Sequence, residues 1–212
     1  MWMQGLNALY TLFSIQFGLP EAVSVVALTL VLRLICLPLS LTAAYQAQQN
    51  KQRMDLLKPK LDALRARLKD DPQQLAAQTM ALYREQGISF LGKWGLLNML
   101  AQSSVGIGIY RTVMSLSLSS RFLWISNLAK PDVLLTVIVT ILMVVAMMLM
   151  PGATQNSMSA WIILIPVGIS LIFLISMPAS VGLYWATTNV VTLLQSIALK
   201  TMVRNRGRRA RG

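Results

Sequence analysis

The chain has 212 residues, of which 55% are hydrophobic and only 12% are charged, with 19 lysines and arginines against 7 acidic residues. A soluble domain carries charge on about a quarter of its residues, so this composition predicts an integral membrane protein. The chain has no histidine and a single cysteine, Cys36, which excludes a histidine-based zinc site, a Ser-His or Cys-His catalytic pair and an internal disulfide. We therefore expect no enzyme activity, no metal and no cofactor.

Residues 1–20 carry no charged side chain, so they lack the basic start of a secretory signal peptide. We expect them to be retained in the mature protein. A longer precursor is an open alternative. Large apolar side chains recur here at helical spacing, at Trp2, Leu6, Leu9, Phe13 and Phe17. This pattern predicts an amphipathic helix that lies flat at the membrane interface. The alternative is a frayed lead-in to the first membrane span.

Five apolar stretches are each near the length of about 20 helical residues that a membrane span requires. They lie at about residues 22–44, 94–113, 133–150, 161–177 and 180–199. The sequence thus predicts an all-α membrane protein with the following units: an interfacial helix at 1–20, a first transmembrane helix at 21–44, a cytoplasmic helical hairpin at 45–92, four further transmembrane helices at 93–199 and a basic tail at 200–212.

The distribution of positive charge predicts the orientation. Nine lysines and arginines lie between residues 45 and 93, and six lie from Lys200 onward. Basic segments stay on the cytoplasmic side, and an odd number of spans puts these two regions on the same side. We expect the amino terminus outside and the carboxyl terminus inside. The tail would rest on anionic lipid or enforce orientation, with ribosomal RNA as the alternative partner.

The polar segment at 45–92 has the pattern of two helices folded into a hairpin. One apolar stripe follows the first helix, at Met54, Leu57, Leu61, Leu64 and Leu68. Asp70-Asp71-Pro72 predicts a turn, an acidic cap and a proline at the first position of the second helix, and Gly87 is suited to ending that helix. We expect Pro59 to kink the first helix or to begin a new one.

Arg33 lies near the middle of the first predicted span. An arginine at that depth costs about 2.5 to 3.5 kcal/mol, so it should face a wet cavity or a partner, and none of the five apolar stretches contains an acidic residue that could pair with it. Polar or aromatic side chains recur at helical spacing on the second and fifth spans, at Asn98, Gln102, Trp185, Asn189, Thr192 and Gln195. The pattern favours a polar cavity around Arg33. The alternative for each residue is hydrogen bonding that holds the helices together.

From about residue 28 onward, the chain resembles the YidC-type insertases of the Oxa superfamily. The segments that carry the resemblance are Leu30-Val31-Leu32-Arg33-Leu34, Leu37-Pro38-Leu39, Leu57-Lys58-Pro59-Lys60-Leu61, Lys69-Asp70-Asp71-Pro72, Leu82-Tyr83-Arg84-Glu85-Gln86-Gly87, Tyr110-Arg111 and Pro178-Ala179-Ser180-Val181-Gly182-Leu183-Tyr184-Trp185, with Asn189 and Gln195. The chain departs from the family at Gly92-Lys93-Trp94-Gly95 and Ala101-Gln102-Ser103-Ser104, where a Gly-Cys-Leu-Pro-like start and a later proline are expected.

The resemblance implies a short bacterial inner-membrane insertase. Its five spans would enclose a hydrophilic groove that is open to the cytoplasm and the lipid, closed outside, and centred on Arg33. We expect the groove to be lined by Arg33, Asn98, Gln102, Tyr184, Trp185, Thr188, Asn189, Thr192 and Gln195, of which Gln102 and Trp185 would contact the client. The implied partners are newly made membrane proteins, which the hairpin would receive, and the lipid bilayer; a Sec-type translocon and the ribosome are further candidates.

Two other classes of function stay open at this stage. A small anion transporter or channel would use Arg33 for selectivity, but it predicts a cavity reaching both faces and an inverted internal repeat, and the sequence has no evident repeat. A structural factor for membrane-complex assembly would use Arg33 only as internal glue. An insertase would instead hold a client's polar segment beside Arg33 part-way across the membrane and release its apolar helix into lipid.

Overall fold

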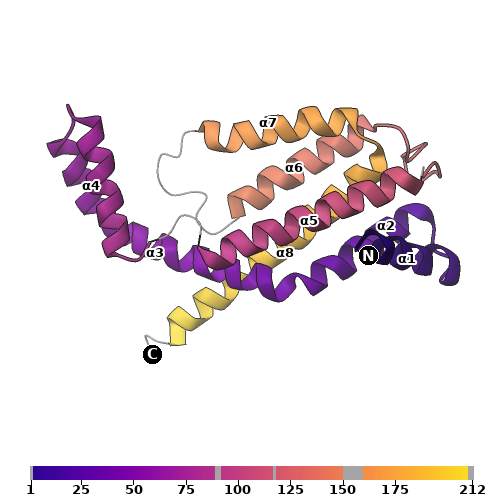
Figure 1. Ribbon diagram of the computed structural model, residues 1–212, viewed down its shortest axis with the longest axis horizontal. Helices are drawn as coiled ribbons and strands as arrows, with labels where there is room; N and C mark the ends of the chain where they lie inside the picture. The colour runs from indigo at the N-terminus through magenta and orange to yellow at the C-terminus, as the bar shows by residue number, and fades with distance from the viewer. Residues whose placement is uncertain (1, 89–91, 117, 150–159, 210–212) are drawn as a thin grey trace.

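The computed structural model of the chain describes residues 2–88, 92–116, 118–149 and 160–209. Within these ranges every regular secondary-structure element is a helix (Figure 1). This confirms the all-α prediction. The elements are α1 (Trp2–Thr11), a short π-helix η1 (Leu12–Gln16), α2 (Glu21–Ile35), α3 (Leu37–Arg67), α4 (Pro72–Glu85), α5 (Lys93–Leu116), α6 (Val133–Leu149), α7 (Ala160–Ser176) and α8 (Ala179–Arg209).

The core of the bundle is centred on α8, which packs against α2 and most extensively against α6, while α7 packs on α6 and α3 on α5. Val25, Leu28, Ile109 and Val139 are almost completely buried in this core. α6 and α8 approach closely because residue 182 is glycine: a Cβ there would lie 2.7 Å from Leu135 Cδ2. Figure 1 shows α5, α6, α7 and α8 side by side, with α4 at one end of the bundle.

The first predicted span is broken in the structure. α2 ends at Ile35 and α3 begins at Leu37, with a bend of 59° between them. Pro38 explains the break, because a proline at the second position of α3 has no N–H to donate to the carbonyl of Leu34, although it is well placed to start a new helix. The second half of the predicted span therefore continues into the hairpin as one helix.

By length and apolar composition, the bent pair α2 and α3 qualifies jointly as a membrane span, whereas no single described helix does so. The other predicted spans correspond to helices α5, α6, α7 and α8. The number of spans and their orientation stay predictions.

The hairpin is formed by the outer part of α3 and by α4. Leu57 and Leu61 of the predicted stripe are buried together with Ile88, in a small cluster of their own. The Asp71 carboxylate caps α4 by accepting a hydrogen bond from Gln74 N at 2.9 Å, and Gly87 follows the helix with φ +62°. Of the two alternatives for Pro59, the start of a new helix is wrong, because α3 continues through this residue; a kink at Pro59 stays a prediction.

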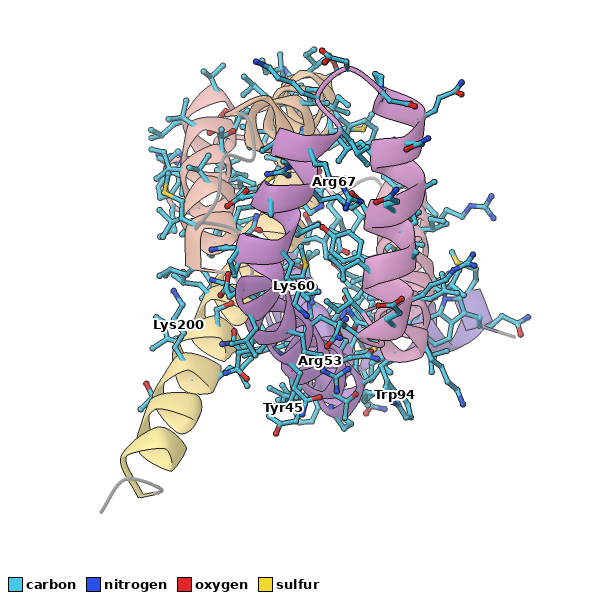
Figure 2. All side chains as sticks on the ribbon, turned by 90° about the vertical axis from the view of Figure 1, so that its left-hand side faces the viewer. Tyr45, Arg53, Lys60, Arg67, Trp94 and Lys200 are labelled. Carbon is cyan, nitrogen blue, oxygen red and sulfur yellow. The ribbon has the colours of Figure 1, made fainter. Side chains whose placement is uncertain are left out.

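The two basic regions of the sequence lie at the same end of the bundle. Figure 2 views the molecule from the hairpin end and shows Arg53, Lys60 and Arg67 on α3, with Lys200 on α8 at the same end. This arrangement agrees with the common side on which the sequence places them.

The amino-terminal segment is helical and packs against α5. Leu6 and Tyr10 are buried there, and a Cβ at Gly108 would lie 2.5 Å from Leu6 Cδ1. Of the predicted apolar stripe, Leu6 is buried and Trp2 and Phe17 are exposed, and Tyr10, which was outside the stripe, is buried as well. Burial and, to a lesser degree, the Glu21 carboxylate raise the pKa of Tyr10 to about 12. The location of this segment at the membrane interface stays a prediction.

Candidate functional site

Two cavities adjoin at Arg33 and Gln102, which line both of them. The larger, which we call the aromatic chamber, has a volume of about 560 Å³ and is lined by Arg33, Gln102, Ser103, Gly106, Ile107, Tyr110, Phe173, Val181, Tyr184, Trp185 and Thr188. The smaller, which we call the small-residue chamber, has a volume of about 350 Å³ and is lined by Arg33, Ser40, Ala43, Ala44, Ala47, Gly95, Asn98, Gln102, Thr192, Gln195, Ser196 and Leu199.

Arg33 occupies the junction of the two chambers. It lies in the last turn of α2, directly before the bend at Cys36, and its Nε donates a hydrogen bond to Thr188 Oγ1 on α8 at 3.4 Å. This bond is long and therefore weak. Among the residues that the structure describes, no carboxylate forms an ion pair with Arg33. A half-buried guanidinium without a counter-ion needs water or a polar ligand, and the adjoining chambers provide the space.

Tyr184 forms a buried part of the aromatic chamber, opposite α5. Its hydroxyl reaches the backbone of α5 at Gly106, where a Cβ would lie 3.0 Å from the Tyr184 oxygen. A side chain at residue 106 would push this hydroxyl away. The Trp185 ring lies 5.6 Å from the Phe173 ring of α7, tilted by 60°. The chamber therefore combines one cation with hydroxyl groups and an aromatic wall.

The small-residue chamber contains unsatisfied amide groups. Asn98 Oδ1 and Gln195 Nε2 are buried and have no hydrogen-bond partner in the described part of the chain. Thr192 uses its hydroxyl to donate to Thr188 O at 2.9 Å. Buried polar atoms are normally paired, and here an acceptor on α5 and a donor on α8 are free to bind water or a polar ligand.

The aromatic chamber opens between α5 and α7. On α5, Ser103 and Ile107 are exposed, and on α7 the Phe173 side chain is 41% exposed. These two helices are not among the described pairs that pack extensively. A peptide segment in the aromatic chamber would therefore have an exit with apolar side chains between α5 and α7.

Eight of the nine predicted groove residues line the two chambers: Arg33, Asn98, Gln102, Tyr184, Trp185, Thr188, Thr192 and Gln195. The ninth, Asn189, is half-buried on α8 and lines neither chamber. That these residues bind a client stays a prediction. The sequence analysis did not predict that Ser103, Gly106 and Phe173 line the aromatic chamber. Ser103 follows Gln102 directly and Gly106 lies one helical turn beyond Gln102, so both could have been found from that residue. Phe173 could not, because an apolar residue in an apolar helix gives no indication that it lines a polar cavity.

Comparison with known proteins identifies one family model and several relatives with the same kind of name. The model of the family described as 60Kd inner membrane protein matches residues 12–206. A Helicobacter pylori protein named membrane protein insertase YidC is 31% identical over 190 residues, which cover 87% of this chain and 34% of the relative. A Streptococcus agalactiae protein named membrane protein insertase YidC 2 is 32% identical over 214 residues, which cover 95% of this chain and 68% of the relative.

A Ralstonia nicotianae protein named membrane protein insertase YidC is 30% identical over 186 residues, which cover 85% of this chain and 32% of the relative. The chain thus spans about a third of the length of the Helicobacter and Ralstonia relatives and about two thirds of the Streptococcus relative. These matches confirm the resemblance to YidC-type proteins.

Proposed function

The chain belongs to the 60Kd inner membrane protein family, and on that premise we propose that it is a membrane protein insertase that works through the two chambers around Arg33. The observation that carries the proposal is the Arg33 guanidinium, which lacks a carboxylate partner in the described chain and lies where the aromatic and small-residue chambers meet. A charge that served only as structural glue would have its donors satisfied by protein groups.

In the proposed mechanism the groove holds a polar client segment part-way across the membrane. Arg33 attracts an acidic or polar part of the client, and the amide groups of Asn98 and Gln195, with water, take over hydrogen bonds that the client loses on leaving the aqueous phase. The barrier to crossing falls because the polar segment never meets a dry hydrocarbon core. No nucleotide takes part in this step.

The apolar client helix then leaves sideways into lipid. Its exit would be the opening between α5 and α7, past Ile107 and Phe173. Transfer to lipid is driven by about 0.3 to 0.6 kcal/mol for each central Leu, Ile, Phe or Val. The membrane potential adds about 2.3 kcal/mol per elementary charge per 100 mV when a charge of the right sign crosses.

The proposed setting is the bacterial inner membrane, with the amino terminus outside and the carboxyl terminus in the cytoplasm. The clients are newly made membrane proteins, and the hairpin of α3 and α4 receives them at the basic end of the bundle. A Sec-type translocon and the ribosome are the further partners that we propose, the latter through the basic tail and hairpin.

Site-specific photo-crosslinking during synthesis of a small membrane protein tests the function. A photoreactive residue at Gln102 or Trp185 should capture the nascent chain. Leu100 on α5 and Val190 on α8 are matched controls, because they belong to the same helices, are exposed and line neither chamber. Equal capture from all four positions, or none from Gln102 and Trp185, would overturn the proposed route. A steady anion current through the purified protein would favour a channel instead.

A further inference from the structure

Residues 118–132, which lead from α5 to α6, contain a tight turn whose central residues are bulky and apolar. Phe122 N donates to Ile125 O at 2.9 Å and Ile125 N donates to Phe122 O at 2.8 Å, so Leu123 and Trp124 form a two-residue tip. Leu123 has φ +51°, in the left-handed region that glycine and asparagine adopt most readily. A bulky apolar residue at this position points to a role for its side chain, since a turn alone would favour glycine or asparagine.

The base of this segment is fixed to the bundle. Ile125 and Leu128 are almost completely buried, and the carbonyl of Leu128 accepts a hydrogen bond from Ser180 N in the first turn of α8 at 3.1 Å. Ser120 N donates to the Glu21 carboxylate at 2.9 Å, which ties the segment to the start of α2. Figure 1 shows the segment at the end of the bundle opposite α4.

The tip itself is exposed, and one of its two side chains is hydrogen-bonded to the start of α6. The side chains of Leu123 and Trp124 are 65% and 46% exposed. Asp132 Oδ1 accepts hydrogen bonds from Trp124 Nε1 at 3.3 Å and from Leu135 N at 2.7 Å, so one carboxylate oxygen connects the indole to the first turn of α6. The turn therefore presents two apolar side chains outward and restricts the motion of one of them.

Two exposed cations accompany the tip. Arg121 directly precedes the turn and Lys130 follows it, while the carboxylate of Asp132 is engaged by the indole and by the α6 backbone. Tryptophan favours the boundary between headgroups and acyl chains, because its ring is apolar and its N–H is polar, and guanidinium and ammonium groups bind phosphate. The two apolar side chains of the tip suit the boundary with the acyl chains, and the two cations suit the phosphate groups of a phospholipid surface.

We propose that the Leu123-Trp124 turn is a membrane anchor that inserts into the boundary between phospholipid headgroups and acyl chains, with Arg121 and Lys130 on the lipid phosphates. The anchor fixes the depth of the segment to which the first turn of α8 is hydrogen-bonded. Val181 and Tyr184, in the next residues of α8, line the aromatic chamber, so the anchor also fixes the depth of that end of the chamber.

Depth-dependent quenching in vesicles tests the anchor directly. Full-length protein with Cys36→Ser and one new cysteine, Leu123→Cys or Trp124→Cys, is labelled with an environment-sensitive fluorophore and reconstituted into phosphatidylcholine and phosphatidylglycerol. Ser126→Cys is the matched control, because Ser126 is exposed, polar and close to the same turn. Lipids with a nitroxide near the headgroup, lipids with a nitroxide deep in the acyl chain, and aqueous iodide serve as quenchers.

We expect the shallow nitroxide to quench labels at 123 and 124 about threefold more than a label at 126, and iodide to show the opposite order. Equal iodide quenching at all three positions overturns the anchor. Protection from both iodide and nitroxide would reveal contact with a second copy of the chain and overturns it as well. The vesicles contain no other protein, so the lipid contact is measured without a protein partner.

The contribution of the cations is tested separately. Arg121→Gln with Lys130→Gln, in the Leu123→Cys background, should lower shallow quenching about twofold in vesicles with phosphatidylglycerol. Unchanged quenching would remove the phosphate contacts from the proposal. Circular dichroism and elution volume identify variants that fail to fold, and the two independent label positions keep the test decisive if one is lost.

Discussion

Arg33 on α2 and Thr188 on α8 are joined by a single long hydrogen bond, from the guanidinium Nε to the threonine Oγ1 across 3.4 Å. In the part of the chain that the structure describes, it is the one hydrogen bond of the Arg33 side chain. The Nη groups of Arg33 are therefore available to a ligand in the chambers, and the contact with Thr188 orients the guanidinium toward them. Several testable consequences concern this site and the packing around it.

The first prediction concerns the charge of Arg33. Arg33→Ala should slow insertion of a client with an acidic translocated segment by about tenfold, which corresponds to about 1.4 kcal/mol of lost stabilisation. Arg33→Lys should retain part of the activity, because it keeps the charge but loses the planar donor arrangement. The measurement is insertion of a small client into vesicles containing the purified protein.

Thr188→Val is the matched control for Arg33, because it removes the hydrogen bond and keeps the charge. We expect it to slow insertion about twofold, in line with the small contribution of a long hydrogen bond. A client without charged residues in its translocated part should tolerate both changes. Normal insertion of the acidic client by the Arg33→Ala variant would contradict the role of the charge.

The second prediction concerns the space that Gly106 leaves for Tyr184. Gly106→Ala places a methyl group 3.0 Å from the Tyr184 hydroxyl, so the ring must move within the aromatic chamber. We expect weaker crosslinking of the client from Trp185, with a fall of about threefold, and little change in thermal stability. Gly168→Ala on α7 is the control, since a Cβ at residue 168 meets nothing within 4 Å and this residue lines neither chamber. Equal effects of the two substitutions would refute the steric argument.

The third prediction concerns the contact between α6 and α8. Gly182→Ala places a Cβ 2.7 Å from Leu135 Cδ2, and Leu135 is buried and has little room to move. We expect destabilisation of about 1 to 3 kcal/mol, as is typical of an overpacked core. Unfolding in detergent, followed by circular dichroism against denaturant concentration, would measure it. Gly168→Ala on α7, where a Cβ meets nothing within 4 Å, should not lower the midpoint and can raise it slightly, because alanine favours a helix over glycine.

The fourth prediction concerns pH and the docking of α1. The pKa of Tyr10 is about 12 in the folded chain, against 10 for an exposed tyrosine, and burial is the main cause. The docked state therefore binds the proton more tightly than the undocked state. Docking should be fully stable below pH 10 and weaken progressively as the pH rises from 10 to 12.

Tyr10→Phe provides the comparison, because phenylalanine cannot lose a proton. Docking can be followed by a crosslink between cysteines introduced at Leu6 and Gly108, with Cys36→Ser in the background; the side chain of Leu6 lies against residue 108. Crosslinking yields measured at a series of pH values between about 9 and 12, without a return to neutral pH, would report the loss of docking. If the Tyr10→Phe variant and the protein with Tyr10 lost docking equally above pH 10, a group other than Tyr10 would cause the pH dependence.

Several features could be predicted from the sequence because they depend on residues close together in the chain. Composition indicated a membrane protein, and the length of the apolar stretches predicted helices where the structure has α5, α6, α7 and α8. The capping of α4 by Asp71 and its termination before Gly87 follow from local hydrogen bonding and backbone preference. Arg33 was identified because a charge within an apolar stretch is costly wherever the neighbouring helices lie.

Other features depended on how the helices meet. The break at Cys36 was not predicted, and for Pro59 both a kinked helix and a new helix stayed open, because a proline is compatible with several helical positions until its neighbours fix whether the missing hydrogen bond matters. Leu6 and Tyr10 are the buried residues of α1 because contacts with α5 and α2 set the rotation of this helix. Helical spacing gives the residues that share a face but not the direction of that face.

The residue pattern was enough to predict that the chain is helical, that it belongs in a membrane and that Arg33 requires a polar environment. The packed helices were needed to show that Asn98 and Gln195 share one chamber with Arg33, that Tyr184 reaches Gly106, and that Asn189 lines neither chamber. The difference lies in the range of the interactions: composition and capping act over a few residues of chain, whereas a cavity is defined by side chains from separate helices whose relative rotation is set by packing.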